Sequence, residues 1–284
     1  MKRGYADTRW GQIHYVSDGT GAPLILLGPA GRSSRVHAAL IPLLAGRYRV
    51  VAPDMLGFGS SDPLPEGATI ETLAESIVDL LTVIKTPRAH VYGLHTGNKI
   101  AAALAARRSD CVDKLVLCGQ THSLIPEQKR RNEVILGLVH GYFAHGEANG
   151  VPNRALEGWA ATYRDVAALW WDKTLFVAGD TAASIERTRQ RVLDEIQACG
   201  STAAIYEANF AYDLGADLRR IESQTLIVEV VTPGEDRTIG RQGERLTKII
   251  RNSTLITLDE PLDTVVTLEN RAVELSGILI SFLG

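Results

Sequence analysis

The stretch from His90 to Ala101 constrains the fold of this 284-residue chain more than any other part of the sequence. An apolar run leads into Gly93-x-x-x-Gly97, and apolar residues at helical spacing follow it. This order predicts a strand, a sharp turn and a helix. Glycine at both positions gives the turn room, because a Cβ atom there would clash. We therefore expect His95 to be held at the strand end in a strained conformation.

The turn Gly-Leu-His-Thr-Gly resembles the nucleophile elbow of the α/β-hydrolase superfamily, whose pattern is Gly-x-Ser-x-Gly. His95 stands where that pattern has serine. Further segments resemble the superfamily in the expected order: an oxyanion loop after 23–28, an Asp-x-x-Gly-x-Gly-x-Ser turn within 50–62, a core strand at 111–119, and a last strand and helix at 253–283. The ordered set implies the fold of a capped member of the superfamily, and it does not by itself imply the activity.

Apolar strands alternate with amphipathic helices, which predicts an α/β fold with a mostly parallel sheet covered on both faces. The resemblance implies eight strands and a helical cap. We expect residues 1–119 and 220–284 to form the α/β-hydrolase core, and residues 120–219 to form the cap. The expected strands lie at 5–9, 12–17, 24–27, 48–52, 90–93, 114–118, 225–231 and 253–258. The expected helices lie at 33–44, 69–85, 96–107, 127–143, 153–171, 181–198, 240–252 and 268–283.

Composition and charge exclude several classes of partner. The net charge is −3 and there is no basic stripe, so neither nucleic acid nor an acidic membrane surface is an expected partner. No apolar run approaches the ~20 residues that span a bilayer, and the N-terminus does not resemble a signal peptide. The widely spaced Cys111, Cys118 and Cys199 predict a reducing compartment. We therefore expect a cytoplasmic protein that binds a small-molecule substrate, with a homodimer left open.

The usual acyl-enzyme mechanism of this fold lacks its partners in this chain. That mechanism needs a nucleophile on the elbow, a histidine after the last strand and an acid after the penultimate strand. His95 replaces the nucleophile, and no histidine follows His145. A neutral imidazole can instead act as a general base, because its pKa lies near neutrality. We predict this catalytic role for His95, with a role as nucleophile left open; the alternative to both is a histidine that only fills the space of the serine.

Two loops supply candidate carboxylates that would fix the tautomer of the elbow histidine and raise its basicity. Asp236, with Glu235 beside it, follows the penultimate strand, where the superfamily places its acid. Asp263, with Asp259 and Glu260 near it, follows the last strand, where the superfamily places its histidine. The alternative for each carboxylate is a solvated loop charge.

Backbone amides near the elbow are candidate donors to an oxyanion or enolate. Thr96 begins the helix after the elbow and Ala30 lies in the oxyanion loop, so both amides suit negative charge. Arg32 and Ser34 could hold a substrate oxygen, and a serine there also suits a helix cap. No histidine or cysteine spacing matches a metal site, and no glycine-rich nucleotide motif follows a strand. We therefore expect neither a metal nor a cofactor.

The leading prediction is a cofactor-independent enzyme that acts on a small, partly apolar carbonyl compound with His95 as the base. Lyase, isomerase and cyclase outcomes stay open, as does atypical hydrolysis by a water that the histidine activates. One rival is a catalytically silent ligand-binding or regulatory protein. Another is a hydrolase with a displaced triad, which would use Ser33 or Ser34 with His37.

Overall fold

The computed structural model describes residues 1–119, 124, 126–144, 190, 193–194, 196–198, 200–233, 236, 240–259, 268 and 271–284. Its centre is an eight-stranded sheet in the order β1-β2-β4-β3-β5-β6-β7-β8. The strands are β1 (Lys2–Thr8), β2 (Gly11–Asp18), β3 (Ala22–Leu27), β4 (Tyr48–Pro53), β5 (Ala89–Leu94), β6 (Val112–Cys118), β7 (Gln224–Val231) and β8 (Ser253–Asp259). β2 pairs antiparallel with β1 and β4, and all other neighbours pair parallel, which confirms the predicted mostly parallel sheet.

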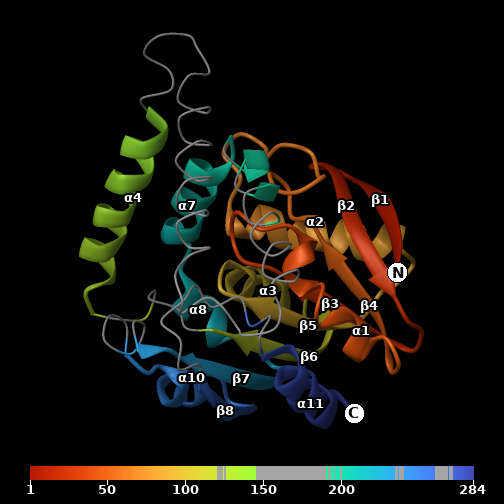
Figure 1. The fold of residues 1–284 in the computed structure, drawn as a ribbon. Coiled ribbons are helices and arrows are strands. Elements are labelled where there is room, and N and C mark those ends of the chain that lie inside the picture. Colours follow the sequence, from red (N-terminus) through yellow and green to blue (C-terminus); the bar gives the residue numbers. More distant parts are fainter. Residues whose placement is uncertain are drawn as a thin grey trace, which may run out of the picture.

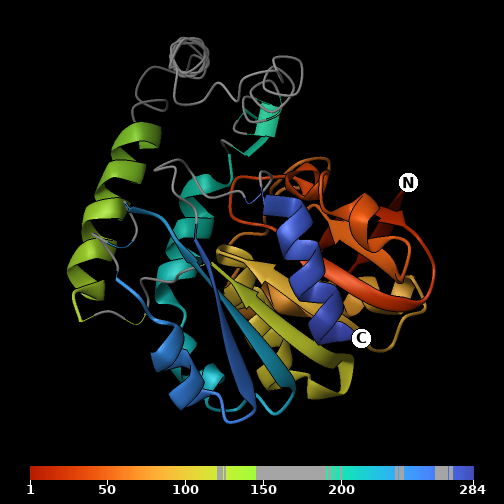
Figure 2. The same cartoon turned by 60° about the horizontal axis from the view of Figure 1, so that its bottom comes forward.

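Helices cover both faces of this sheet (Figures 1 and 2). The described helices are η1 (Ser34–His37), α1 (Ile41–Leu44), α2 (Ile70–Val83), α3 (Thr96–Arg107), η2 (Ser109–Cys111), α4 (Gln128–Ala144), α7 (Thr202–Ala211), α8 (Leu214–Leu218), α10 (Gly243–Ile249) and α11 (Ala272–Leu283). Helices α2, α3 and α8 pack on one face, and α1 and α11 pack on the other. The prediction of helices on both faces is confirmed.

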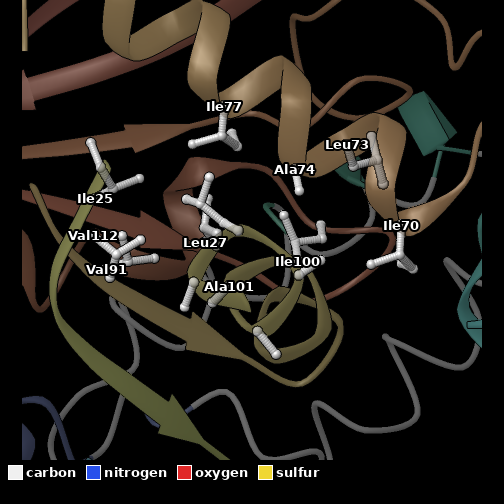
Figure 3. Close-up of a cluster of buried hydrophobic side chains, with 14 of the residues drawn as sticks. Ile25, Leu27, Ile70, Leu73, Ala74, Ile77, Val91, Ile100, Ala101 and Val112 are labelled. Carbon is white, nitrogen blue, oxygen red and sulfur yellow. The ribbon is translucent and has the colours of Figure 1, made fainter. Parts of the chain in front are cut away.

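Two buried apolar clusters hold the layers together, one on each face of the sheet. In the larger cluster, Ile25 and Leu27 of β3 meet Ile77 of α2 and Ile100 of α3 (Figure 3). All four side chains are at most 1% exposed. Burial of each such side chain contributes about 1.5–3 kcal/mol relative to an exposed one. This packing fixes α3, and with it the turn that precedes α3, against the centre of the sheet.

The segment 33–44 does not form the single helix that its apolar spacing predicts. It forms η1 and then a separate short helix, α1, which begins at Ile41. Pro42 explains the break, because in a continuous helix its ring would clash with the carbonyl group four residues earlier. In the first turn of α1 the proline is tolerated. Ser33 occupies the N-cap position of η1, but its hydroxyl makes no capping hydrogen bond.

Much of the predicted cap, including the expected helix at 153–171, lies outside the described residues. The expected helix at 127–143 is confirmed as α4, which lies beside α7 (Figure 1). Ile205 of α7 and Leu214 of α8 are buried in the larger apolar cluster. Among the described residues, no helix combines the length and apolar content that crossing a bilayer requires.

Candidate active site

β5 leads into α3 through a single residue, His95. Its backbone has φ 50° and ψ −108°, a conformation that non-glycine residues rarely adopt. The amide of His95 donates to the carbonyl oxygen of Cys118 at 3.2 Å, and its own carbonyl accepts from the amide of Asn98 at 2.9 Å. Both backbone groups are therefore fixed, and the predicted strained conformation at the strand end is confirmed.

The two glycines of the elbow permit this close turn. A Cβ atom at Gly93 would lie 2.3 Å from the carbonyl oxygen of Gly97. A Cβ atom at Gly97 would lie 2.3 Å from the carbonyl oxygen of Leu27 in β3. Both contacts are with backbone, which cannot move aside as a flexible side chain would. The elbow therefore packs α3 directly against the end of the neighbouring strand.

The half-buried imidazole of His95 lies over Gly119, the residue that follows β6. A Cβ atom at Gly119 would be 3.1 Å from Cε1 and 3.2 Å from Nδ1 of the His95 ring. Gly119 has φ +82°, and its amide donates to the carbonyl oxygen of Val228 in β7 at 3.0 Å. The carboxyl ends of β5, β6 and β7 thus meet around the histidine, at the edge where parallel sheets bind ligands.

Asn98 fixes the backbone of Cys118 and Gly119 next to the His95 ring. Its buried side-chain amide donates to the carbonyl oxygen of Cys118 at 2.7 Å, and its Oδ1 accepts from the Cys118 amide at 2.8 Å. The same amide lies 3.3 Å from the carbonyl oxygen of Gly119. Asn98 is not among the residues predicted from the sequence. The available signal was a polar residue on the inner face of a helix that is otherwise apolar.

The two candidate donor amides lie beyond the carboxyl ends of two neighbouring strands, β3 and β5. Thr96 is the first residue of α3, and Ala30 lies in the turn after β3. β3 pairs parallel with β5, with Leu27 opposite Gly93, so the turn after β3 runs beside the elbow. Among the described residues, neither amide has a hydrogen-bond partner. Amides at a helix N-terminus and in such a turn favour an anionic oxygen.

Arg32 and Ser34 contact buried carboxylates. Arg32 Nε donates to Asp194 Oδ2 at 3.0 Å, and the Asp194 side chain is completely buried. The Ser34 amide donates to Asp54 Oδ1 at 2.6 Å. Asp194 was not predicted, because nothing local in the chain signals a contact across 162 positions. These contacts tie the loop after β3 to the rest of the molecule.

Asp54 accepts hydrogen bonds on both carboxylate oxygens. Besides the Ser34 amide, the amide of Ser60 donates to Oδ2 at 2.9 Å, and His14 Nδ1 lies 2.9 Å from the same oxygen. A Cβ atom at Gly59 would lie 2.2 Å from that oxygen, so the turn wraps closely around the carboxylate. Asp54 is 2% exposed. Its carboxylate therefore holds this turn together.

The predicted carboxylate partners of His95 follow β7 and β8 in the sequence, and of the two main candidates the structure describes only Asp236. Asp236 is 44% exposed at its side chain, and its Oδ1 lies 3.5 Å from Arg241 Nε. Its amide donates to the carbonyl oxygen of Thr232 at 2.9 Å. Asp263 lies outside the described residues, as do Glu235 and Glu260. Which carboxylate serves His95 therefore stays a prediction.

Among the described residues, no hydrogen bond joins His37 to Ser33 or Ser34, so this part of the chain shows no displaced triad. His37 is 3% exposed and lies edge-on to Tyr92, with ring centroids 5.8 Å apart. Burial, assisted by the charge of Arg32, lowers the pKa of His37 to about 3. His37 Nε2 and Ser33 Oγ are both buried without a hydrogen-bond partner among the described residues, so the two residues make no serine–histidine pair.

Lys99 is a second buried group on the elbow helix. It is 3% exposed, and its Nζ donates to the carbonyl oxygen of Asn209 in α7 at 2.5 Å. The same Nζ lies 5.8 Å from the centroid of the Phe210 ring. Burial lowers the pKa of Lys99 to about 7. The lysine therefore links the elbow helix to α7 through a charge that is costly to keep inside the protein.

Comparison with known families and structures identifies the fold. The family model described as alpha/beta hydrolase fold matches residues 22–152. The structure is similar to that of an enol-lactonase from Burkholderia xenovorans LB400, with a TM-score of 0.72 and 22% identity over 99% of both chains. It is also similar to an alpha/beta hydrolase enzyme from a deep-sea metagenome, with a TM-score of 0.75 and 15% identity over 99% of this chain and 97% of that one.

Two curated relatives with higher identity match a shorter part of the chain. Haloalkane dehalogenase 2 of Mycobacterium tuberculosis is 36% identical over 117 residues, which are 39% of this chain and 41% of that protein. The 2-hydroxy-6-oxononadienedioate/2-hydroxy-6-oxononatrienedioate hydrolase of Paraburkholderia xenovorans is 34% identical over 114 residues, 38% of this chain and 39% of that one. The chain thus matches about two-fifths of the length of these relatives.

Proposed function

We propose that this chain, which has the α/β-hydrolase fold, is an enzyme that uses His95 as a general base on a small carbonyl compound. The observation that carries the proposal is the backbone of His95, held at φ 50° in a one-residue turn at the carboxyl end of the sheet. Such a conformation costs about 1–3 kcal/mol, and proteins retain this kind of strain mainly where it serves a function.

The chemistry is proton transfer. Neutral His95 takes a proton from the carbon beside the substrate carbonyl, and the electron pair moves onto the carbonyl oxygen to give an enolate. The amides of Thr96 and Ala30 donate to that oxygen. The imidazolium then returns the proton to another atom of the substrate, which gives isomerisation, or to a leaving group, which gives elimination or cleavage. The same base acting on water gives hydrolysis.

The names of two similar proteins support a carbonyl substrate. One is an enol-lactonase and the other a hydrolase of a 2-hydroxy-6-oxo acid. A lactone and an oxo acid each carry a carbonyl group whose oxygen becomes anionic during reaction. Asp236 or Asp263 would serve as the carboxylate that orients the base, as the positions of their loops in the sequence suggest.

A panel of simple carbonyl compounds tests the proposal. Exchange of the α-protons of small ketones, oxo acids and lactones into D₂O is followed by ¹H NMR, with hydrolysis monitored in the same samples. We expect exchange or hydrolysis by the native protein that falls about 100-fold or more in His95→Ala and His95→Gln. Asp113→Ala is the matched control, because Asp113 is exposed near the opposite end of β6. We also expect no labelling by a fluorophosphonate, which reacts with activated serines.

Two results would count against this proposal. A rate that persists in His95→Ala and His95→Gln would remove His95 from the chemistry. If the native protein binds members of the panel, seen as a rise in melting temperature, but catalyses neither exchange nor hydrolysis, the silent ligand-binding alternative takes its place.

A further inference from the structure

The sheet ends in two strands of different character, which lie at opposite sides of the molecule (Figure 1). β1 carries exposed charges at Lys2, Arg3 and Asp7. Charges on an edge strand discourage pairing with another chain. β8 has no charged residue and no proline from Ser253 to Leu258. The second edge therefore lacks the protection that the first one has.

Among the described residues, no strand other than β7 pairs with β8. β7 pairs with one side of the strand along its whole length, from Ser253 to Asp259. Thr254, Ile256 and Thr257 are nevertheless exposed, with Ile256 at 38%. A strand pairs on two sides, so the outward N–H and C=O groups of β8 are a template for a further strand.

A positively charged residue precedes the uncharged part of β8, and a negatively charged residue follows it. Arg251 lies two residues before its start and Asp259 is its last residue, and both side chains are exposed. Among the described residues, neither side chain has an ion-pair partner, and Arg271 Nη2 donates to the backbone carbonyl of Asp259 at 2.6 Å. The midpoint between the two positions is Leu255. An identical strand that runs antiparallel, with Leu255 opposite itself, therefore brings each arginine opposite an aspartate.

We propose that β8 pairs antiparallel with the β8 of a second copy of this chain, across a two-fold axis at Leu255. Two Arg251–Asp259 pairs then close the ends of the interface, and Thr254 faces Ile256 of the other copy. A two-fold interface is self-complementary, so one strand can supply both halves. A shift by one or two residues separates the charges, so this register is the one that the charges select.

Charge reversal tests the register. Sedimentation equilibrium of the native chain is expected to show a dimer. Arg251→Glu and Asp259→Arg each replace two attractions with two repulsions, and each is expected to raise the dissociation constant at least about tenfold. The double variant Arg251→Glu/Asp259→Arg restores the pairs and is expected to restore the dimer. Arg3→Glu on β1 is the matched control and is expected to leave the dissociation constant unchanged.

Cysteine cross-linking tests the axis. Residues directly opposite in an antiparallel pair have Cα atoms about 4.5–5.5 Å apart, within reach of a disulfide. Leu255→Cys is therefore expected to give an oxidised dimer on a non-reducing gel. Thr254→Cys is the control, because position 254 meets its own copy only diagonally, at about 7–8 Å. The native Cys111 and Cys118 are buried, and Cys199 is changed to serine in both variants so that it cannot form the cross-link.

Three results would overturn the proposal: a native chain that stays monomeric up to about 1 mM, a dimer that both charge reversals leave intact, or equal cross-linking at positions 254 and 255. Circular dichroism of each variant establishes that the fold is retained.

Discussion

The turn after β4 and the turn after β5 both resemble the superfamily, yet their key side chains are held in opposite ways. The carboxylate of Asp54 is buried and accepts hydrogen bonds from the amides of Ser34 and Ser60 and meets the His14 ring. The imidazole of His95 is half-buried, and its backbone carries the strain. The first turn uses its polar group to hold the fold, whereas the second presents its side chain at the carboxyl edge of the sheet.

The difference between the two turns shows that a segment can resemble the superfamily in structure without resembling it in function. Around Asp54 the neighbouring amides are satisfied by the carboxylate itself. Beside His95, the amides of Thr96 and Ala30 have no partner within the part of the chain that the structure describes. A motif can therefore be retained because the fold needs it, while the residue at the elbow can change with the chemistry. Substitutions at the two turns should accordingly affect different measurements.

The largest effect is expected from Asp54→Ala. The substitution leaves the buried Ser34 amide, the part-buried Ser60 amide and the His14 ring without their acceptor, and each unsatisfied buried donor costs about 1–3 kcal/mol. We expect the free energy of unfolding, measured with urea, to fall by about 3–5 kcal/mol. The control is Asp113→Ala, whose side chain is 51% exposed and should cost about 1 kcal/mol or less. A loss below 1 kcal/mol for Asp54→Ala would show that the turn does not depend on its carboxylate.

A smaller effect is expected from pH, through Lys99 on the elbow helix. The pKa of Lys99 is about 7 in the folded protein, well below the 10.4 of an unfolded lysine. Between these values the unfolded chain binds more protons, so the free energy of unfolding rises with pH. We expect a rise of up to about 2 kcal/mol from pH 7 to pH 8.5, because one proton contributes about 1.4 kcal/mol per pH unit.

Comparison with Lys99→Met isolates this contribution from other groups that titrate in the same range. The variant should lose the rise with pH, while Lys248→Met, at an exposed position of α10, should keep the native slope. If urea unfolding at pH 7, 7.75 and 8.5 gives the same slope for the native protein and Lys99→Met, the lysine is not the group responsible.

Much of the fold could be predicted from the sequence, because local patterns specify it. Apolar runs mark the strands, and the elbow helix was predicted and found at 96–107. Thr69, where the expected helix at 69–85 begins, is the N-cap of α2, and its Oγ1 accepts from the Thr72 amide at 3.2 Å. Apolar spacing does not reveal the break in the segment 33–44, because that break depends on Pro42 in the first turn of α1.

The site could be predicted only where its parts are local in sequence. His95 stands inside a recognisable turn, so the motif located it. Asn98 and Lys99 act through Cys118 and Asn209, which are 20 and 110 positions away. The spacing of apolar residues along the sequence does not reveal such contacts, since they depend on how strands and helices are brought together in the folded chain.

The smallest effect is expected from relieving the strain at the elbow itself. Glycine adopts positive φ angles at little cost, whereas alanine at φ 50° and ψ −108° keeps the strain of the native His95. His95→Gly and His95→Ala remove the same imidazole. The difference between their free energies of unfolding therefore measures the strain in the backbone at residue 95. We expect His95→Gly to be about 1 kcal/mol more stable than His95→Ala in urea unfolding, and both to be inactive in the exchange assay. At the unstrained Ala103 in the middle of α3, Ala103→Gly should instead cost about 1 kcal/mol.

The sign of the difference in stability between His95→Gly and His95→Ala decides between two accounts of the elbow. If His95→Gly is the more stable variant and neither is active, the chain carries strain in order to present an imidazole, in contrast to the Asp54 turn. If His95→Gly is the less stable variant, the surrounding contacts with Cys118 and Asn98 fix the turn without strain. The contrast between the two turns would then rest on the side chains alone.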